Sequence, residues 1–176
     1  MKSFKKFLIE KETTYGGFEV RTPSAEEDKY FKANPKVAGY YGTGSVGDKS
    51  QEGTIVVNPY NQYMKDPNKR EGLKALEAVR GAQEMVPDIL DRAPDLTPEQ
   101  DKNLNFYSDD PRVRKGTFYS RLAVGDTLNP EGDGEPQVTP EQESYNKEIQ
   151  DTVLNDRRFI GKIKAQRLEY MPRNLA

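Results

Sequence analysis

Residues 66–87 read Asp-Pro-Asn-Lys-Arg-Glu-Gly-Leu-Lys-Ala-Leu-Glu-Ala-Val-Arg-Gly-Ala-Gln-Glu-Met-Val-Pro, the pattern of one amphipathic helix with both ends marked. Asp66 followed by Pro67 is typical of a helix start, because the Asp side chain can accept backbone N–H groups and proline fits the first helical position. Pro87 predicts the end of this helix, because the residue before a proline disfavours helical backbone dihedral angles. Spacings near three and four predict a buried face made of Leu73, Leu76, Val79 and Val86.

Four further segments carry helix-start signals. Three are capping boxes, in which a Ser or Thr precedes a Glu or Gln by three residues, and they begin at Ser24, Thr97 and Thr139. Asp110 repeats the Asp-Pro start, and the helix after it is predicted to end at Gly125, a residue type common after the last helical turn. Five helices are therefore predicted, and the apolar face of the one after Asp110 would consist of Val113, Phe118, Leu122 and Val124.

The segment after Thr139 carries the longest apolar stripe. If Gly161 is tolerated inside a helix, the stripe predicts one helix of roughly thirty residues. A helix of that length would need a partner surface for its apolar residues, which are Tyr145, Ile149, Val153, Ile160 and Ile163.

The pattern changes between residues 37 and 60. Residues 37–41 and 54–57 are rich in β-branched and aromatic types and are joined by a glycine-rich connection, which predicts a β-hairpin. Within the connection, Asp48 separates the glycine and lysine that a phosphate-binding loop needs side by side. We therefore interpret the connection as a hairpin turn rather than a nucleotide site.

Together these elements predict a mainly α fold of the α+β class, a helical domain with one β-hairpin and with extended N- and C-terminal segments. The expected organisation begins with a docking or targeting segment at residues 1–22, followed by the hairpin and helical domain at 23–126. An acidic linker rich in glycine and proline is expected at 127–138, and a long amphipathic helix with a basic tail at 139–176.

Composition restricts the chemistry. Of the 176 residues, 34% are hydrophobic and 32% are charged, so we expect a thin core and surfaces that are buried against partners. Cysteine and histidine are absent, which excludes disulfides, thiolate or imidazole metal sites and nucleophiles activated by His. We expect no cofactor and no metal site. No apolar run approaches the roughly 18 residues of a membrane-spanning helix, so no membrane span is predicted.

Charge is divided unevenly along the chain. The net charge is -2, yet residues 157–176 hold six basic residues and one acidic residue, whereas residues 84–143 hold fourteen acidic and six basic residues. Such a distribution suits either head-to-tail association of like subunits or contact of the basic end with nucleic acid. In the second case the phosphate-binding residues would be Arg157, Arg158, Lys162, Lys164 and Arg167.

Residues 1–10, Met-Lys-Ser-Phe-Lys-Lys-Phe-Leu-Ile-Glu, are basic and amphipathic. Phe4, Phe7 and Leu8 share one helical face, and the lysines lie off it. The stretch resembles the capsid-targeting leader of internal head proteins of T-even-type phages, which starts Met-Lys, carries a second aromatic residue at position seven and ends at a hydrophobic-x-Glu site cut by the prohead protease. The resemblance implies a processing site at Glu10. The alternative is an ordinary amphipathic helix that packs on its own domain.

A series of short motifs follows one order along residues 30–145. It runs through Phe31-Lys-Ala-Asn-Pro35, Ile55-Val-Val-Asn-Pro-Tyr60, Asp95-Leu-Thr-Pro-Glu-Gln100, Phe118-Tyr-Ser-Arg121 and Val138-Thr-Pro-Glu-Gln142. This order resembles a family of small tailed-bacteriophage proteins of unassigned role. The resemblance implies a virion protein made in the cytoplasm of a host bacterium, and it carries over no catalytic residues.

We therefore expect a non-enzymatic, virion-associated structural protein that docks on other virion proteins, with copies of itself as a further partner. The expected docking residues are Phe4, Phe7 and Leu8 near the N-terminus and Ile160, Ile163 and Leu168 in the C-terminal helix.

Two other functions remain open. One is a nucleic-acid-associated internal virion protein that binds DNA through the basic C-terminal helix. The other is a carboxylate-based, wall-degrading accessory enzyme, for which the helical carboxylates to consider are Glu77 and Glu84.

Overall fold

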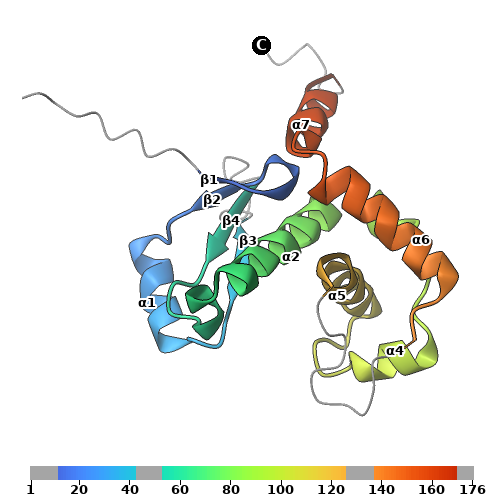
Figure 1. Cartoon of the computed structure of the whole chain (residues 1–176), viewed down its shortest axis with the longest axis horizontal. Helices are drawn as coiled ribbons and strands as arrows, with labels where there is room; N and C mark the ends of the chain where they lie inside the picture. The colour runs from blue at the N-terminus through green and yellow to red at the C-terminus, as the bar shows by residue number, and fades with distance from the viewer. Residues whose placement is uncertain (1–11, 43–52, 126–136, 170–176) are drawn as a thin grey trace, which may run out of the picture.

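The computed structural model describes residues 12–42, 53–125 and 137–169. Within them the chain is mainly helical with one small β-sheet, as the sequence predicts (Figure 1). The helices are α1 (Ala25–Ala33), α2 (Pro67–Met85), α3 (Asp88–Asp91), α4 (Pro98–Asn103), α5 (Pro111–Val124), α6 (Pro140–Ile149) and α7 (Phe159–Glu169). The sheet and α1 lie on one side of α2, and α4, α5 and α6 lie on the other.

The sheet has four strands, β1 (Glu12–Thr13), β2 (Glu19–Arg21), β3 (Gly39–Gly42) and β4 (Thr54–Val57), in the order β1-β2-β4-β3. β3 and β4 form the predicted antiparallel hairpin, in which Tyr41 lies opposite Ile55. β2 pairs with the other edge of β4 in parallel, so that Val20 also lies opposite Ile55. The hairpin turn, residues 43–52, lies outside the described residues.

Residues 12–21 belong to the sheet and core, which corrects the assignment of residues 1–22 to a separate docking segment. A 3₁₀ turn, η1 (Tyr15–Gly17), leads into Phe18, which is fully buried. The Phe18 ring lies 5.8 Å from the ring of Tyr41 and 6.5 Å from that of Phe159, measured between centroids. Residues 1–11 lie outside the described residues, and with them the predicted sites Phe4, Phe7, Leu8 and Glu10.

All five predicted helix starts are confirmed. Ser24, Thr97 and Thr139 each accept the backbone N–H of the residue three positions later, and the side chain of that residue accepts the N–H of the cap. Asp66 caps α2 and Asp110 caps α5. Gly125 follows α5 with φ 67°, a left-handed conformation that favours glycine, so its predicted role is also confirmed.

α2 is the centre of the core. Leu76 and Val79 are buried as predicted, and Leu73 and Val86 are partly buried at the edge of the same cluster. Gly81 faces the sheet, where an added Cβ would lie 2.5 Å from a ring carbon of Tyr41. The absence of a side chain at this position therefore sets how closely the helix approaches the strands.

The C-terminal helix is not continuous, which corrects the predicted helix of roughly thirty residues. α6 is followed by a π-helical turn, η4 (Gln150–Leu154), and α7 begins only at Phe159. Asp156 forms a turn in the break, in which its carboxylate accepts the backbone N–H of Arg158 at 3.0 Å and its carbonyl accepts that of Phe159, the first residue of α7, at 2.9 Å. The break lets Phe159 and Ile160 enter the core, with exposed fractions of 5% and 6%.

α4 and α6 are joined by the side chains of Gln100 and Gln142, called here the glutamine pair. Each Nε2 donates to the Oε1 of the other residue, at 2.9 and 2.8 Å. Each Oε1 also accepts the backbone N–H of its own helix cap, and each Nε2 donates to the carbonyl two residues before the cap of the partner helix. Both side chains are buried and all their polar atoms are bonded. Two capping boxes thus form one symmetric connection.

Candidate functional site

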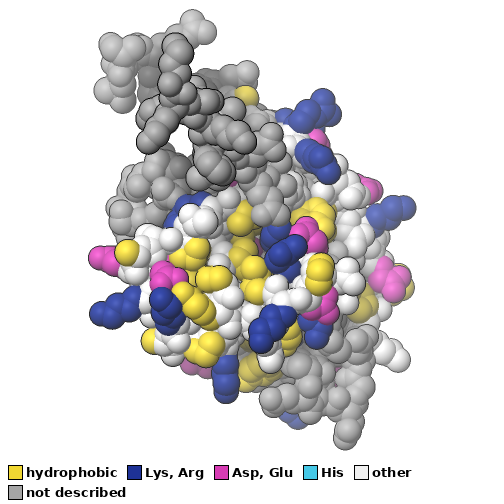
Figure 2. Space-filling view, turned by 60° about the vertical axis from the view of Figure 1, so that its left-hand side comes forward, with side chains coloured by type: hydrophobic (Ala, Val, Ile, Leu, Met, Phe, Trp, Pro, Cys, Tyr) yellow, Lys and Arg dark blue, Asp and Glu magenta, His cyan; other side chains and the backbone are white. Residues whose placement is uncertain are grey.

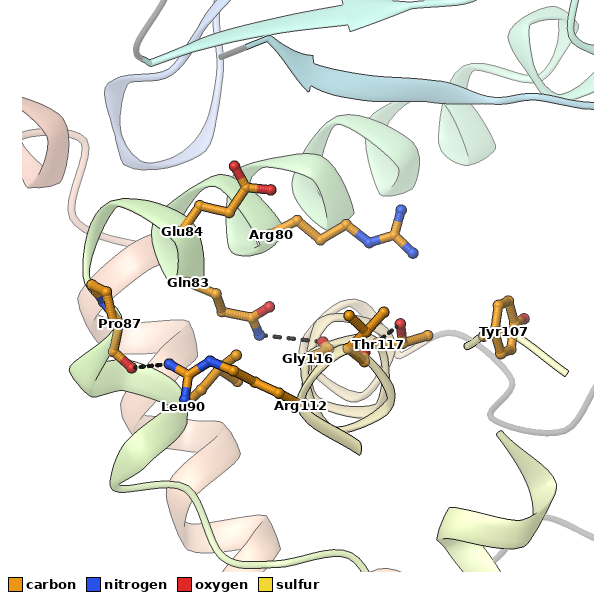
Figure 3. Close-up of a pocket in the computed structure, with 10 residues that line it drawn as sticks. Arg80, Gln83, Glu84, Pro87, Leu90, Tyr107, Arg112, Gly116 and Thr117 are labelled. Carbon is orange, nitrogen blue, oxygen red and sulfur yellow. Dashed lines mark hydrogen bonds between the residues drawn. The ribbon is translucent and has the colours of Figure 1, made fainter. Parts of the chain in front are cut away.

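A groove of about 620 Å³ lies between the C-terminal half of α2 and α5 (Figure 3). Pro87 and Leu90 lie at one end of it and Tyr107 lies at the other. α2 contributes three polar side chains to the lining, and α5 lies across from them. The lining residues on these two helices are Arg80, Gln83, Glu84, Arg112, Val113, Gly116 and Thr117.

The floor of the groove is a close approach of α2 to α5. Gln83 Nε2 donates to the carbonyl of Gly116 at 3.3 Å, and Ser120 Oγ lies 3.3 Å from Gln83 Oε1. A Cβ at position 116 would lie 3.1 Å from Gln83 Oε1, so a side chain there would press against the buried amide. Glycine therefore permits the two helices to be joined through Gln83 rather than only through apolar contacts.

Two of the three charged side chains on the groove are already paired. Arg80 contacts the carboxylate of Glu77 at 3.1 Å, and Arg112 contacts Asp91 at 2.5 Å while donating to the carbonyl of Pro87. Glu77 is 2% exposed, and burial raises the pKa of its carboxyl group although Arg80 opposes the shift. Neither arginine therefore presents an uncompensated charge to a ligand.

Glu84 is the third charged residue and it differs from the other two. Its side chain makes no hydrogen bond or ion pair with any residue that the structure describes. Loss of surrounding water raises the pKa of its carboxyl group, and the charge of Arg80 lowers the pKa to a smaller extent. The groove thus has one carboxylate that makes no hydrogen bond or ion pair within the described part of the chain.

The open side of the groove is apolar. Val113 is 48% exposed and lines the groove directly. Phe106 is 66% exposed, and its ring lies 4.0 Å from the ring of Tyr107, which also lines the groove. Arg121 lies over the same tyrosine ring, 4.8 Å from its centroid. An apolar surface therefore continues from the groove wall to the exposed Phe106.

A second surface lies on the α1 side of the molecule, where apolar side chains are interspersed with charged ones (Figure 2). Tyr60 and Tyr63, at the 3₁₀ turn η3 (Gln62–Lys65), are about two-fifths exposed. However, Lys32 lies over the Tyr60 ring and Lys69 over the Tyr63 ring, and the Tyr60 hydroxyl donates to Asp28 at 2.7 Å. These rings already have partners in the chain, so the groove is the stronger candidate.

The structure corrects one of the predicted C-terminal docking residues. Ile160 is 6% exposed and packs in the core of its own chain, so its side chain is not available to a partner. Ile163 is partly buried against the same core. Leu168 belongs to α7, but its side chain lies outside the described part of the structure.

The predicted phosphate-binding residues lie mostly at the surface. Arg157, Arg158, Lys162 and Lys164 are exposed, and the side chain of Arg167 lies outside the described part of the structure. Arg158 and Lys162 both contact Asp156, and these contacts hold the pKa of that carboxyl group at about 2. The basic group is therefore partly neutralised by its own chain.

Sequence reasoning considered Glu84 but missed the groove around it. Its lining comes from α2, α5 and the connections beside them, which no local pattern brings together. One signal was present in the sequence, because Gly116 lies inside the predicted helix after Asp110, where an interior glycine usually indicates a close packing contact.

Among the described residues, no group of three or more Asp and Glu side chains is placed to hold a metal ion. No helix in that part of the chain combines the length and the hydropathy needed to cross a membrane. No protein-family model matches the chain, and no curated protein or solved structure matches it.

Proposed function

We propose that this chain is a non-enzymatic, virion-associated protein of a tailed bacteriophage and that it binds another virion protein in the groove between α2 and α5. The observation that carries the proposal is the pair of exposed apolar side chains at the groove: Val113 lines it and is 48% exposed, and Phe106, 66% exposed, packs on Tyr107 of the lining. Exposed aromatic side chains beside a concave surface are typical of protein interfaces. The phage context is supported by the motifs along residues 1–10 and 30–145.

The carboxylates near the groove support binding rather than hydrolysis. Glycoside hydrolysis commonly needs two carboxyl groups that face the substrate about 5–10 Å apart. Glu84 is the one carboxylate among the described residues that line the groove. Glu77, the other candidate, is buried and held by Arg80. A wall-degrading reaction at this site would therefore lack its second carboxylate.

Binding of DNA through the basic end is a second candidate function. It is favoured by the arrangement of residues 157–164, in which Ile160 packs inward while Arg157, Arg158 and Lys164 are exposed. Salt-dependent contacts with phosphate groups need exposed cations of this kind.

Mass spectrometry of purified phage particles tests the proposal. Peptides from this chain should be present at a constant ratio to the shell or tail proteins. After the particles are opened, treated with nuclease and washed at high salt, the chain should remain with the proteins. Its absence from the particles would refute the proposal, and its release together with the DNA would favour the second candidate.

A further inference from the structure

We infer that the groove binds a basic amphipathic segment and that its occupant is the N-terminal segment, residues 1–11, of a second copy of this chain. The inference rests on the proposed function, because it names the partner of the same groove. It depends on Glu84, which has no ion pair with a described residue, on the exposed apolar side chains at the groove and on the position of β1 in the fold.

Charge favours a basic occupant. The two arginines of the groove are compensated by Glu77 and Asp91, whereas Glu84 has no ion pair with any described residue. Residues 1–11 contain four lysines and one glutamate. A lysine that reaches Glu84 would form an ion pair with a carboxylate that has none among the described residues.

The apolar pattern of residues 1–11 also fits the groove. Phe4, Phe7 and Leu8 are spaced as on one face of a helix, which is the usual arrangement when a helix lies in a groove. Eleven helical residues would measure about 16 Å, and the apolar face would meet Val113 and Tyr107 of the lining, with Phe106 beside Tyr107. Lys2, Lys5 and Lys6 are spaced off that face, so they remain free to approach Glu84.

Topology favours a second copy over the same one. Residue 12 begins β1, which is an outer strand of the sheet and pairs with β2. α2 lies between the sheet and α5, so β1, where the described part of the chain begins, lies on the far side of α2 from the groove (Figure 1). A copy that gives its segment to one neighbour and receives a segment from another would form a head-to-tail assembly.

Fluorescence anisotropy tests binding directly, with the full chain titrated into a labelled synthetic peptide of residues 1–11. Val113→Asp should weaken binding by about tenfold or more, because it places a charge at an apolar contact, and Glu84→Gln should weaken it by about three- to tenfold. Both positions are at the surface, so the variants should fold, which circular dichroism checks. Glu143→Gln, a matched change at an exposed position on α6, should leave binding unchanged.

Peptide variants separate the apolar and the basic contributions. A Phe4→Ser, Phe7→Ser peptide keeps all charges and should lose binding, and replacement of the lysines by Gln should weaken binding and reduce its salt dependence. Absence of binding by the natural peptide would overturn the inference. Binding that is insensitive to both Val113→Asp and Glu84→Gln would also overturn it, because the peptide would then occupy another site.

Sedimentation velocity tests whether the occupant comes from a second copy. The full chain should associate in a concentration-dependent manner, and the Phe4→Ser, Phe7→Ser chain should be a monomer. The inference would be overturned if the natural chain stayed monomeric and the Phe4→Ser, Phe7→Ser chain bound added peptide more tightly than the natural chain. That result would assign the groove to the segment of the same chain. If the chain is present in particles but neither binds the peptide nor self-associates, the inference is refuted and the proposed function as a virion protein stands.

Discussion

The glutamine pair offers a sharp test of how the fold is held together. Replacing Gln142 by Met keeps a side chain of similar length and flexibility but removes four hydrogen bonds, two of them to Gln100. A buried hydrogen bond contributes about 1 kcal/mol net, and the partners left unsatisfied add to the cost. We therefore expect Gln142→Met to lower the free energy of unfolding by about 3 kcal/mol, and Gln100→Met to do the same.

The double variant distinguishes a pair from two independent caps. When both residues are Met, no glutamine amide is left without its partner. The free energy of unfolding should therefore fall by about 4 kcal/mol rather than by about 6 kcal/mol, the sum of the two single losses. The resulting coupling of about 2 kcal/mol would be measured by urea unfolding followed by far-ultraviolet circular dichroism. Gln166→Met, at an exposed position on α7, serves as the control and should change stability little. Additive losses, within about 0.5 kcal/mol, would refute the pairing.

Two further predictions concern the N-terminal half of the fold. Gly17→Ala should lower the melting temperature by about 4–8 °C, because Gly17 has φ 83° and the added Cβ would lie 2.5 Å from the carbonyl oxygen of Arg157. Gly72→Ala is the control and should not lower the melting temperature, because a Cβ at Gly72 would meet open space. Arg21 holds the pKa of Glu27 well below its ordinary value of 4.5, so this contribution to stability is present above that value and is lost as the pH falls toward the folded-state pKa. Urea midpoints between pH 6 and 2 should fall less steeply for Glu27→Gln, and an equally steep fall would contradict the assignment.

Features that depend on a few neighbouring residues could be predicted from the sequence. Each helix start is a cap within four residues, and the β-hairpin joins two strands that are close in the chain, so these elements are visible in local patterns. The parallel pairing of β2 with β4 was not visible, because Val20 and Ile55 are separated by α1 and β3. The capping boxes at Thr97 and Thr139 were predicted one by one, but their meeting depends on how α4 and α6 pack.

The broken C-terminal helix shows how a correct pattern can give a wrong element. The apolar stripe marks residues that are indeed buried, including Val153 and Ile160. Apolar residues keep helical spacing on both sides of Asp156, and the break interrupts that spacing over only a few residues. The sequence pattern therefore predicts one continuous helix. The competing local signal was Asp156 itself, which can end one helix and cap the next. The groove was missed for a related reason, since its wall needs the contact of Gly116 with Gln83.

The contact between η1 and the segment that leads into α7 also bears on how the chain is made. Gly16 lies against the carbonyl of Val153, where an added Cβ would be 2.8 Å away, and Phe18 packs on Phe159. Phe159 follows Phe18 by 141 positions in the chain, so during synthesis the first strands are complete well before this neighbour leaves the ribosome. Products that stop before residue 159 would lack the ring that covers one side of Phe18, and that part of the core would be open to proteases.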